Sequence, residues 1–355
     1  MVQTLGIGIG AGLVSALLFG LLLKATPLAI ILYLLAPLPI LIVGLGWNPR
    51  AALAAAVSGS LALAVVITPF LGLGFAAYLA LPAWWLAYLA LLGRPNADGS
   101  LEWYPTGRLL GWTGATAALA FIAIAVMASP SHEAFQGQLR GLAGTLVRAQ
   151  MRDQPPAPAR PEAGKDAGTD AAKDTAKDTA KDAGGSEGPA PAEAVTAETG
   201  PQADLADALA RAVPAFAANG LALLLTFYLW ASARIVQFSG RLPRPWPDIP
   251  ATVMPRAMLA LLAIAVILAF APGYAGVLGT ALVGSVSAVF ALQGLAAFHD
   301  RSRGRPARGA LLFGLYLILF VTQGIALVAL TLFGLADTAL DRRRPQGPPK
   351  GGARP

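Results

Sequence analysis

Long apolar stretches separated by short polar segments dominate the chain. Closed β-barrels would show short alternating segments instead. Because about 20 apolar residues in a helix cross the hydrocarbon layer of a bilayer, the pattern predicts an all-α, polytopic membrane protein. We expect about nine spans, with eight and ten as alternatives. Nine stretches lack Asp, Glu, Lys, Arg and His: residues 5–23, 28–45, 51–70, 71–92, 109–128, 215–233, 257–271, 273–298 and 310–335.

Proline and glycine set the boundaries that hydropathy leaves open. Residues 51–92 are too long for one helix, and we expect a break near Pro69 and Gly72. The pair Pro272-Gly273 divides residues 257–298 in the same way. Residues 1–4 carry no Lys or Arg, so we expect the first stretch to be a retained helix and not a signal peptide.

An amphipathic helix is expected over residues 129–152, after the fifth span. Ser129-Pro130-Ser131 resembles a helix start. Such a helix either lies in the membrane interface or packs on the membrane domain. Its apolar stripe is Phe135, Leu139, Leu142, Leu146 and Val147, and Arg140, Arg148 and Arg152 lie off that stripe.

The composition changes at residue 153. Residues 153–204 are rich in Ala, Pro, Asp, Lys, Glu and Gly and include a four-residue repeat over 172–183. Such a segment buries too little apolar surface to offset its ordering entropy, so we expect a disordered linker. It joins an N-terminal membrane half, 1–128 with five spans, to a C-terminal half, 205–340 with four. Residues 341–355 are expected to form a disordered basic tail.

The amino-acid composition excludes most kinds of catalytic and metal-binding site. The 355 residues are 56% hydrophobic and 13% charged, with two histidines and no cysteine. Thiolate nucleophiles and cysteine metal sites are therefore excluded. No phosphate-binding loop, HExxH or GxSxG motif occurs. We expect no catalytic residue, no metal and no cofactor.

The net charge of +7 does not indicate a nucleic-acid partner, because the basic residues lie in short loops beside apolar stretches. Lipid headgroups and membrane topology explain them, and the expected partner is the lipid bilayer. With nine spans, one end, which we call face A, holds the N-terminus and loops 46–50, 93–108, 234–256 and 299–309. Its many arginines predict a cytoplasmic face A in a bacterial inner membrane. Lys24 and the basic tail, which nine spans place on the opposite face, argue the other way.

Aromatic and proline-rich segments gather on face A. All seven tryptophans lie at or beyond span ends there. They form either an anchoring belt or a ligand or partner surface. Gln293 has the alternative role of an interhelical hydrogen bond. The candidate surface is Trp84, Trp85, Trp103, Tyr104, Arg241, Arg244, Trp246, Asp248 and Gln293.

Small residues recur every fourth position in two spans. Such stripes let helices approach closely inside a membrane. We expect internal helix packing or, alternatively, docking of another membrane subunit. The residues are Gly8, Gly12, Ala16 and Gly20 in the first span, and Gly276, Thr280, Gly284 and Ala288 in the eighth.

Several motifs resemble a bacterial domain-of-unknown-function family of predicted multi-spanning membrane proteins. The resemblance covers most of the chain outside 153–204 and the tail. The chain is more distantly similar to the substrate-capture subunits of energy-coupling-factor transporters. This similarity implies that the protein captures a small ligand and that a partner supplies energy. The motifs are the first-span glycine stripe, Pro82-Ala-Trp-Trp85, Trp103-Tyr-Pro105 with Gly107-Arg108-Leu-Leu110, residues 240–247, residues 291–295 with His299, and residues 334–338 with Asp341.

Three functional hypotheses follow. The first is a non-enzymatic, transporter-like protein that captures a solute or lipid-like ligand on face A. The second is a structural scaffold of cell-envelope or division machinery. The third is an enzyme acting on lipid at the interface through Asp248, His299, Asp300 or Asp337.

Overall fold

The computed structural model describes residues 2–152, 200–322 and 324–341. Most of the predicted linker and tail, and Gln323, therefore lie outside the described residues. The chain divides into two compact units, which we call unit 1 (residues 1–139 and 211–355) and unit 2 (residues 140–210).

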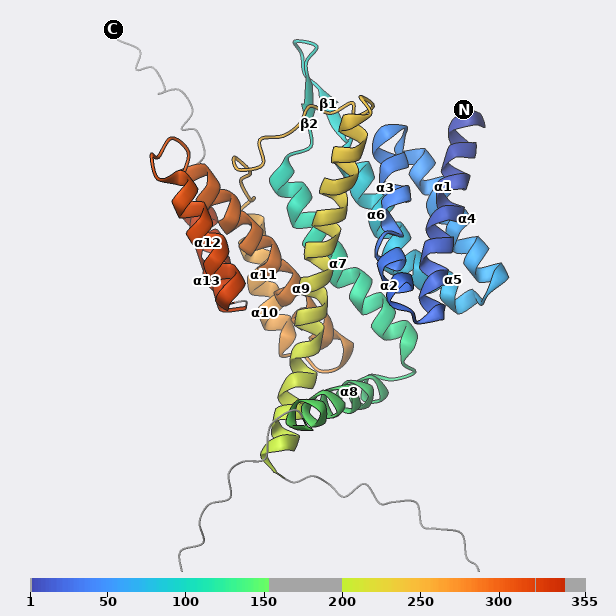
Figure 1. Ribbon diagram of the computed structural model, residues 1–355, viewed down its shortest axis with the longest axis vertical. Helices are drawn as coiled ribbons and strands as arrows, with labels where there is room; N and C mark the ends of the chain where they lie inside the picture. Colours follow the sequence, from blue (N-terminus) through green and yellow to red (C-terminus); the bar gives the residue numbers. More distant parts are fainter. Residues whose placement is uncertain (1, 153–199, 323, 342–355) are drawn as a thin grey trace, which may run out of the picture. The chain divides into compact units, whose positions relative to one another are not determined.

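The part of the chain that the structure describes is all-α, with one two-stranded hairpin (Figure 1). Among the described residues, seven helical segments are long and apolar enough to cross a membrane, and α10, α12 and α13 are shorter apolar helices. The prediction of an all-α polytopic protein is confirmed. The elements are α1 (Val2–Gly20), η1 (Leu21–Lys24), α2 (Pro27–Leu34), α3 (Pro37–Gly46), α4 (Pro49–Val66), α5 (Pro69–Phe75), η2 (Ala76–Ala80), α6 (Leu81–Ala90), β1 (Gly93–Pro95), β2 (Leu101–Trp103), α7 (Thr106–Ala128), α8 (His132–Arg152), α9 (Pro201–Phe238), α10 (Ala257–Ala269), α11 (Gly273–Arg301), α12 (Arg308–Thr322) and α13 (Gly324–Leu340).

Polar caps followed by proline start three of the N-terminal helices. The side chains of Thr26, Asn48 and Thr68 each accept a backbone N–H from the first turn of the following helix. The next residue is proline each time. Proline suits this position because it lacks a backbone N–H, and the N–H groups of a first helical turn have no partner within the helix. The predicted break near Pro69 is confirmed, although α4 ends at Val66, earlier than residue 70. Gly273, with φ of +70°, opens α11 at the other predicted break.

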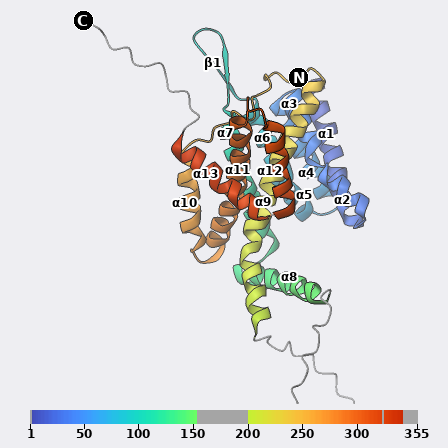
Figure 2. The ribbon, with the colours of Figure 1, turned by 60° about the vertical axis from the view of Figure 1, so that its left-hand side comes forward.

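The last predicted span, residues 310–335, is wrong as a single helix. The chain forms two helices there, α12 and α13, seen beside α11 in Figure 2. At the end of α13, Asp341 lies 3.3 Å from Arg256, the residue before α10. The chain therefore returns to face A, and the prediction that the tail begins on the opposite face is also wrong. Apolar residues continue through the reversal, so hydropathy does not reveal it.

Face A is one end of unit 1. It carries the N-terminal end of α1, the β1–β2 hairpin and the connections from α9 to α10 and from α11 to α12 (Figure 1). The strands pair antiparallel, with Gly93 opposite Trp103. The hairpin extends past the helix ends in both Figures 1 and 2.

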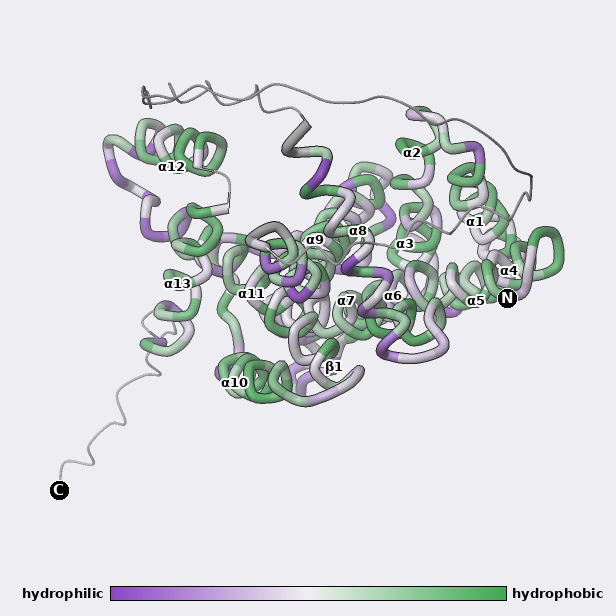
Figure 3. The backbone as a smooth tube through the Cα atoms, turned by 90° about the horizontal axis from the view of Figure 1, so that it is seen from below, coloured by the Kyte–Doolittle hydropathy of each residue, from purple (hydrophilic) through white to green (hydrophobic). Residues whose placement is uncertain are grey.

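Several apolar clusters lie inside unit 1, and two of them are described here. The first lies among α1–α7 and α9 and buries Ile40, Leu41 and Phe75 completely. The second lies beside α11, where Phe290 and Met254 are buried. Outward-facing residues stay apolar, as Val65 and Phe320 show at 84% and 81% exposure. Figure 3 shows hydrophobic residues along most of these helices. This exterior is compatible with lipid contact.

Unit 2 contains the last part of α8 and the first turns of α9. Arg140 and Asp207 form an ion pair of 3.0 Å within it. Because α9 begins at Pro201, residues 201–204 are helical and do not belong to the predicted linker. The interfacial position of α8 stays a prediction.

Candidate functional site

The connection between α9 and α10, residues 239–256, is attached to four separate parts of face A. We call it the roof loop. Arg241 stacks over Trp47, with its guanidinium carbon 4.4 Å from the ring centroid. Arg244 Nη1 donates to the carbonyl of Ala90 at 3.1 Å. Asp248 pairs with Arg303, and Arg256 pairs with Asp341. The roof loop thereby connects loops that lie far apart in the sequence.

Beneath the roof loop lies a mostly apolar pocket of about 520 Å³. Its walls come from α7, α9 and α11, and its volume is within the range of sites for small molecules. The lining residues are Leu45, Ala90, Leu91, Thr106, Leu109, Leu110, Thr113, Leu223, Thr226, Phe227, Leu229, Trp230, Ala233, Leu242, Arg244, Pro245, Trp246, Pro247, Ile249, Pro250, Thr252, Leu292, Leu295, Ala296, His299 and Tyr316.

Few polar groups line this pocket. The hydroxyls of Thr113 on α7 and Thr226 on α9 lie 3.1 Å apart and link the two walls. Those of Thr106 and Thr252 lie 3.5 Å apart, where α7 begins under the roof loop. Arg244 is half-buried, and burial lowers the pKa of its guanidinium below the ordinary value. Because arginine titrates far above neutral pH, it still carries a full charge in the pocket.

Three aromatic residues that line the pocket are also exposed. Phe227 and Trp230 on α9 are 54% and 46% exposed, and Tyr316 on α12 is 48% exposed. Helix α12 buries none of its residues. The pocket lining therefore reaches helices whose outer surfaces are apolar.

Only two residues of the predicted surface, Arg244 and Trp246, line the pocket. Trp246 lies under Arg234, whose guanidinium carbon is 4.4 Å from its ring centroid. Arg241 is exposed and held on Trp47, outside the lining. Arg241 and Arg244 therefore lie in different environments although they belong to the same loop.

Trp84, Trp85 and Tyr104 belong to a separate aromatic cluster between α6 and α7. Trp84 and Trp85 have ring centroids 6.2 Å apart, and Trp85 meets Trp112 edge-on at 5.5 Å. Trp112 Nε1 donates to the hydroxyl of Tyr104 at 3.0 Å. Trp103 lies on β2, opposite Gly93. Their role as a ligand or partner surface stays a prediction.

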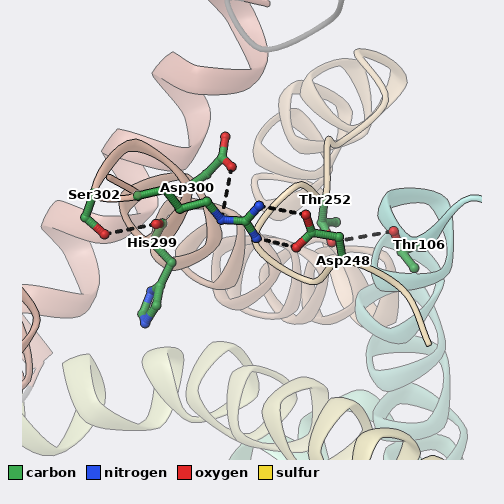
Figure 4. A network of polar contacts seen from close by, with 7 residues as sticks. Thr106, Asp248, Thr252, His299, Asp300 and Ser302 are labelled. Carbon is green, nitrogen blue, oxygen red and sulfur yellow. Dashed lines mark hydrogen bonds and ion pairs between the residues drawn. The ribbon is translucent and has the colours of Figure 1, made fainter. Parts of the chain in front are cut away.

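Asp248 belongs to an exposed ion-pair network at the roof loop (Figure 4). Arg303 donates to both of its carboxylate oxygens, one at 2.8 Å. The Arg303 hydrogen bonds hold the pKa of Asp248 below its ordinary value of 3.8. Arg303 Nε also lies 3.7 Å from Asp300. In Figure 4 the ring of His299 points away from this network.

Gln293 makes an interhelical hydrogen bond, the alternative expected from the sequence. Its Nε2 donates to Asp337 on α13 at 2.9 Å, and both residues are buried. Arg301 Nη2 lies 3.1 Å from the other oxygen of Asp337. Helix α13 continues past residue 335, the end of the last stretch without charged residues, and so includes Asp337.

The small-residue stripes lie at close helix contacts inside unit 1. A Cβ at Gly8 or Gly12 would overlap carbonyl oxygens of α4. A Cβ at Gly284 would overlap the carbonyl of Ala215 on α9, and one at Gly276 the carbonyl of Ala271. Ala16 and Ala288 are buried, whereas Gly20 has room for a methyl group.

Sequence reasoning missed most of the pocket. Much of its lining consists of Leu and Ala residues, which do not differ from other apolar residues of the spans. The clearest indication of the pocket in the sequence was Thr113 and Thr226, two polar residues within predicted spans. Among the described residues, no group of three His, Asp or Glu side chains has the geometry of a metal site.

Comparison of the chain with protein-family models, curated proteins and solved structures gives no match.

Proposed function

We propose that this protein captures a lipid-like ligand in the pocket beneath the roof loop, as the binding part of a transporter-like system that a partner energises. The observation that carries the proposal is the pocket itself, with apolar walls and a few polar groups near its roof. Binding sites for small amphiphilic molecules combine these two features.

Exposed aromatic residues in the pocket lining favour a ligand that enters from the bilayer. Phe227, Trp230 and Tyr316 line the pocket and are exposed, and they lie on apolar helices. The proline-rich segment of the roof loop covers the end of the pocket near face A. A ligand moving sideways from lipid keeps its acyl chain out of water throughout this path.

A pocket-filling variant tests the proposal. Ala296→Phe places a ring in the pocket from α11, whereas Ala275→Phe adds the same ring at an exposed position of the same helix. Each protein is purified from its own membrane in mild detergent and examined by native mass spectrometry, followed by lipid extraction and identification.

We expect the wild-type protein and Ala275→Phe to retain a bound amphiphile. We expect occupancy in Ala296→Phe to fall by roughly tenfold, equivalent to about 1.4 kcal/mol of binding free energy. Equal occupancy in all three proteins, or no bound amphiphile in any of them, would contradict the proposal.

A further inference from the structure

Arg244 is a half-buried cation in an otherwise apolar pocket. Its guanidinium carries five N–H donors, and one hydrogen bond, to the carbonyl of Ala90, is described. That carbonyl ends α6 and is a neutral dipole, not a countercharge. Among the described residues, Arg244 forms no ion pair with a carboxylate. A partly desolvated cation is costly unless an anion accompanies it.

The neighbouring charges do not compensate Arg244. No Asp or Glu is among the residues that line the pocket. Asp248, the acidic residue of the roof loop, is held by both guanidinium nitrogens of Arg303. Arg241 is occupied on Trp47 outside the pocket. The electrostatic character of the pocket is therefore set by the positive charge of Arg244.

His299 does not compete for this role. Its Nδ1 lies 3.0 Å from the carbonyl of Leu295, a distance at which the nitrogen carries the hydrogen and donates it. Its Nε2 lies 3.3 Å from the Tyr316 hydroxyl. Both ring nitrogens of His299 therefore already have partners within the protein.

Building on the proposed function, we infer that the captured ligand has an anionic head, a carboxylate or a phosphate, which Arg244 binds under the roof loop. Its chain lies along Leu109 and Leu110 toward the Thr113–Thr226 contact. Arginine suits both head groups because its planar fork matches their oxygens. Thr113 lies seven residues after Thr106, roughly 10 Å deeper along α7, so head and chain occupy different levels of the pocket.

The experiment compares ligands that differ only in the head. Full-length protein is placed in nanodiscs of phosphatidylcholine. Binding is measured for a fluorescent long-chain fatty acid against the corresponding alcohol, and for phosphatidic acid against diacylglycerol. Inorganic phosphate is tested as a competitor, because a free anion offers the same head chemistry without a chain.

The variants are Arg244→Gln, Arg244→Lys and the control Arg94→Gln, which removes an exposed charge of the β1–β2 hairpin outside the pocket. We expect wild type and Arg94→Gln to prefer the anionic member of at least one pair by about tenfold, as one charge-assisted hydrogen bond provides. Arg244→Gln loses this preference while binding the neutral member as wild type does, and Arg244→Lys retains part of it. Inorganic phosphate does not displace the ligand at millimolar concentration.

An unchanged preference in Arg244→Gln, or neutral ligands that bind wild type as tightly as anionic ones, would overturn the anionic head. Displacement by inorganic phosphate would show a free anion as the ligand and overturn the amphiphile. Failure of wild type to bind either member of either pair would instead refute the proposed function. The neutral ligands also report whether Arg244→Gln is folded.

Discussion

At the scale of single residues, the protein places a few polar side chains with defined partners in a largely apolar environment. Asp337 is the clearest example, because its carboxylate is buried and receives hydrogen bonds from Gln293 and Arg301. Gln293 Oε1 is buried without a hydrogen-bond partner among the described residues. This cluster fixes α11 and α13 to each other near face A.

Removing the carboxylate of Asp337 should destabilise the fold. Asp337→Ala leaves Arg301 without its partner, and since the Arg301 side chain is 36% exposed, water lowers the cost to about 2 kcal/mol. The apparent Tm in detergent should fall by roughly 4–8 °C. Asp341→Ala is the matched control, because its partner Arg256 is 62% exposed. An equal Tm for the two variants would contradict this assignment.

The attachment of the roof loop at Asp248 should weaken in acid. The pKa of Asp248 lies below its ordinary value of 3.8 in the folded protein, so its contribution is fully present above pH 3.8 and is lost as the pH falls through the lower, folded value. A spin label at Ala251→Cys should become more mobile below that pH. Adding Asp248→Asn should make the label mobile at neutral pH, and a label that stays immobile there would count against the attachment.

Residue roles were only partly predictable from the sequence. Gln293 was expected to bond between helices because an amide inside a membrane seeks a partner. Arg241 and Arg244 looked equivalent, since both lie beside prolines in one loop. Their different environments arise from contacts with Trp47 and Ala90, which are far away in the sequence.

At the scale of elements, local chemistry decides where helices begin and how closely they approach. Thr68 with Pro69 starts a helix and could be read from the sequence. The α12–α13 reversal could not, because apolar residues continue through it and the helices of 15 and 17 residues together resemble one long span. Hydropathy reports burial in lipid but not chain direction.

The contact between α1 and α4 depends on glycine at position 12. Gly12→Val should lower stability by about 1–3 kcal/mol, because the added atoms meet the backbone of α4, which cannot move like a side chain. Gly10→Val, on the same helix with no atom within 4 Å of an added Cβ, should leave the apparent Tm nearly unchanged. Similar losses in both variants would indicate a general effect of valine in this helix.

At the scale of the whole molecule, face A differs chemically from the opposite end. The roof loop, the β1–β2 hairpin and the end of α13 all lie there. Placing the end of α13 at face A removes one objection to a cytoplasmic face A, since the tail no longer begins on the opposite side. The orientation itself stays a prediction.

The absence of cysteine permits a direct test of that orientation. A single cysteine at Ala97 in the hairpin should react with a membrane-impermeant maleimide only after the inner membrane is permeabilised. A cysteine at Pro130, between α7 and α8, should react in intact spheroplasts. The reverse pattern would place face A outside the cell.

The concentration of tryptophan at face A has an optical consequence. All seven indoles lie in the β1–β2 hairpin, the roof loop or the helix regions nearest to them, so the intrinsic fluorescence comes from one leaflet and its aqueous border. Brominated lipids confined to that leaflet should quench the emission, whereas the same lipids in the other leaflet should leave it almost unchanged. The tryptophan fluorescence of the protein should therefore distinguish the lipid composition of one leaflet from that of the other.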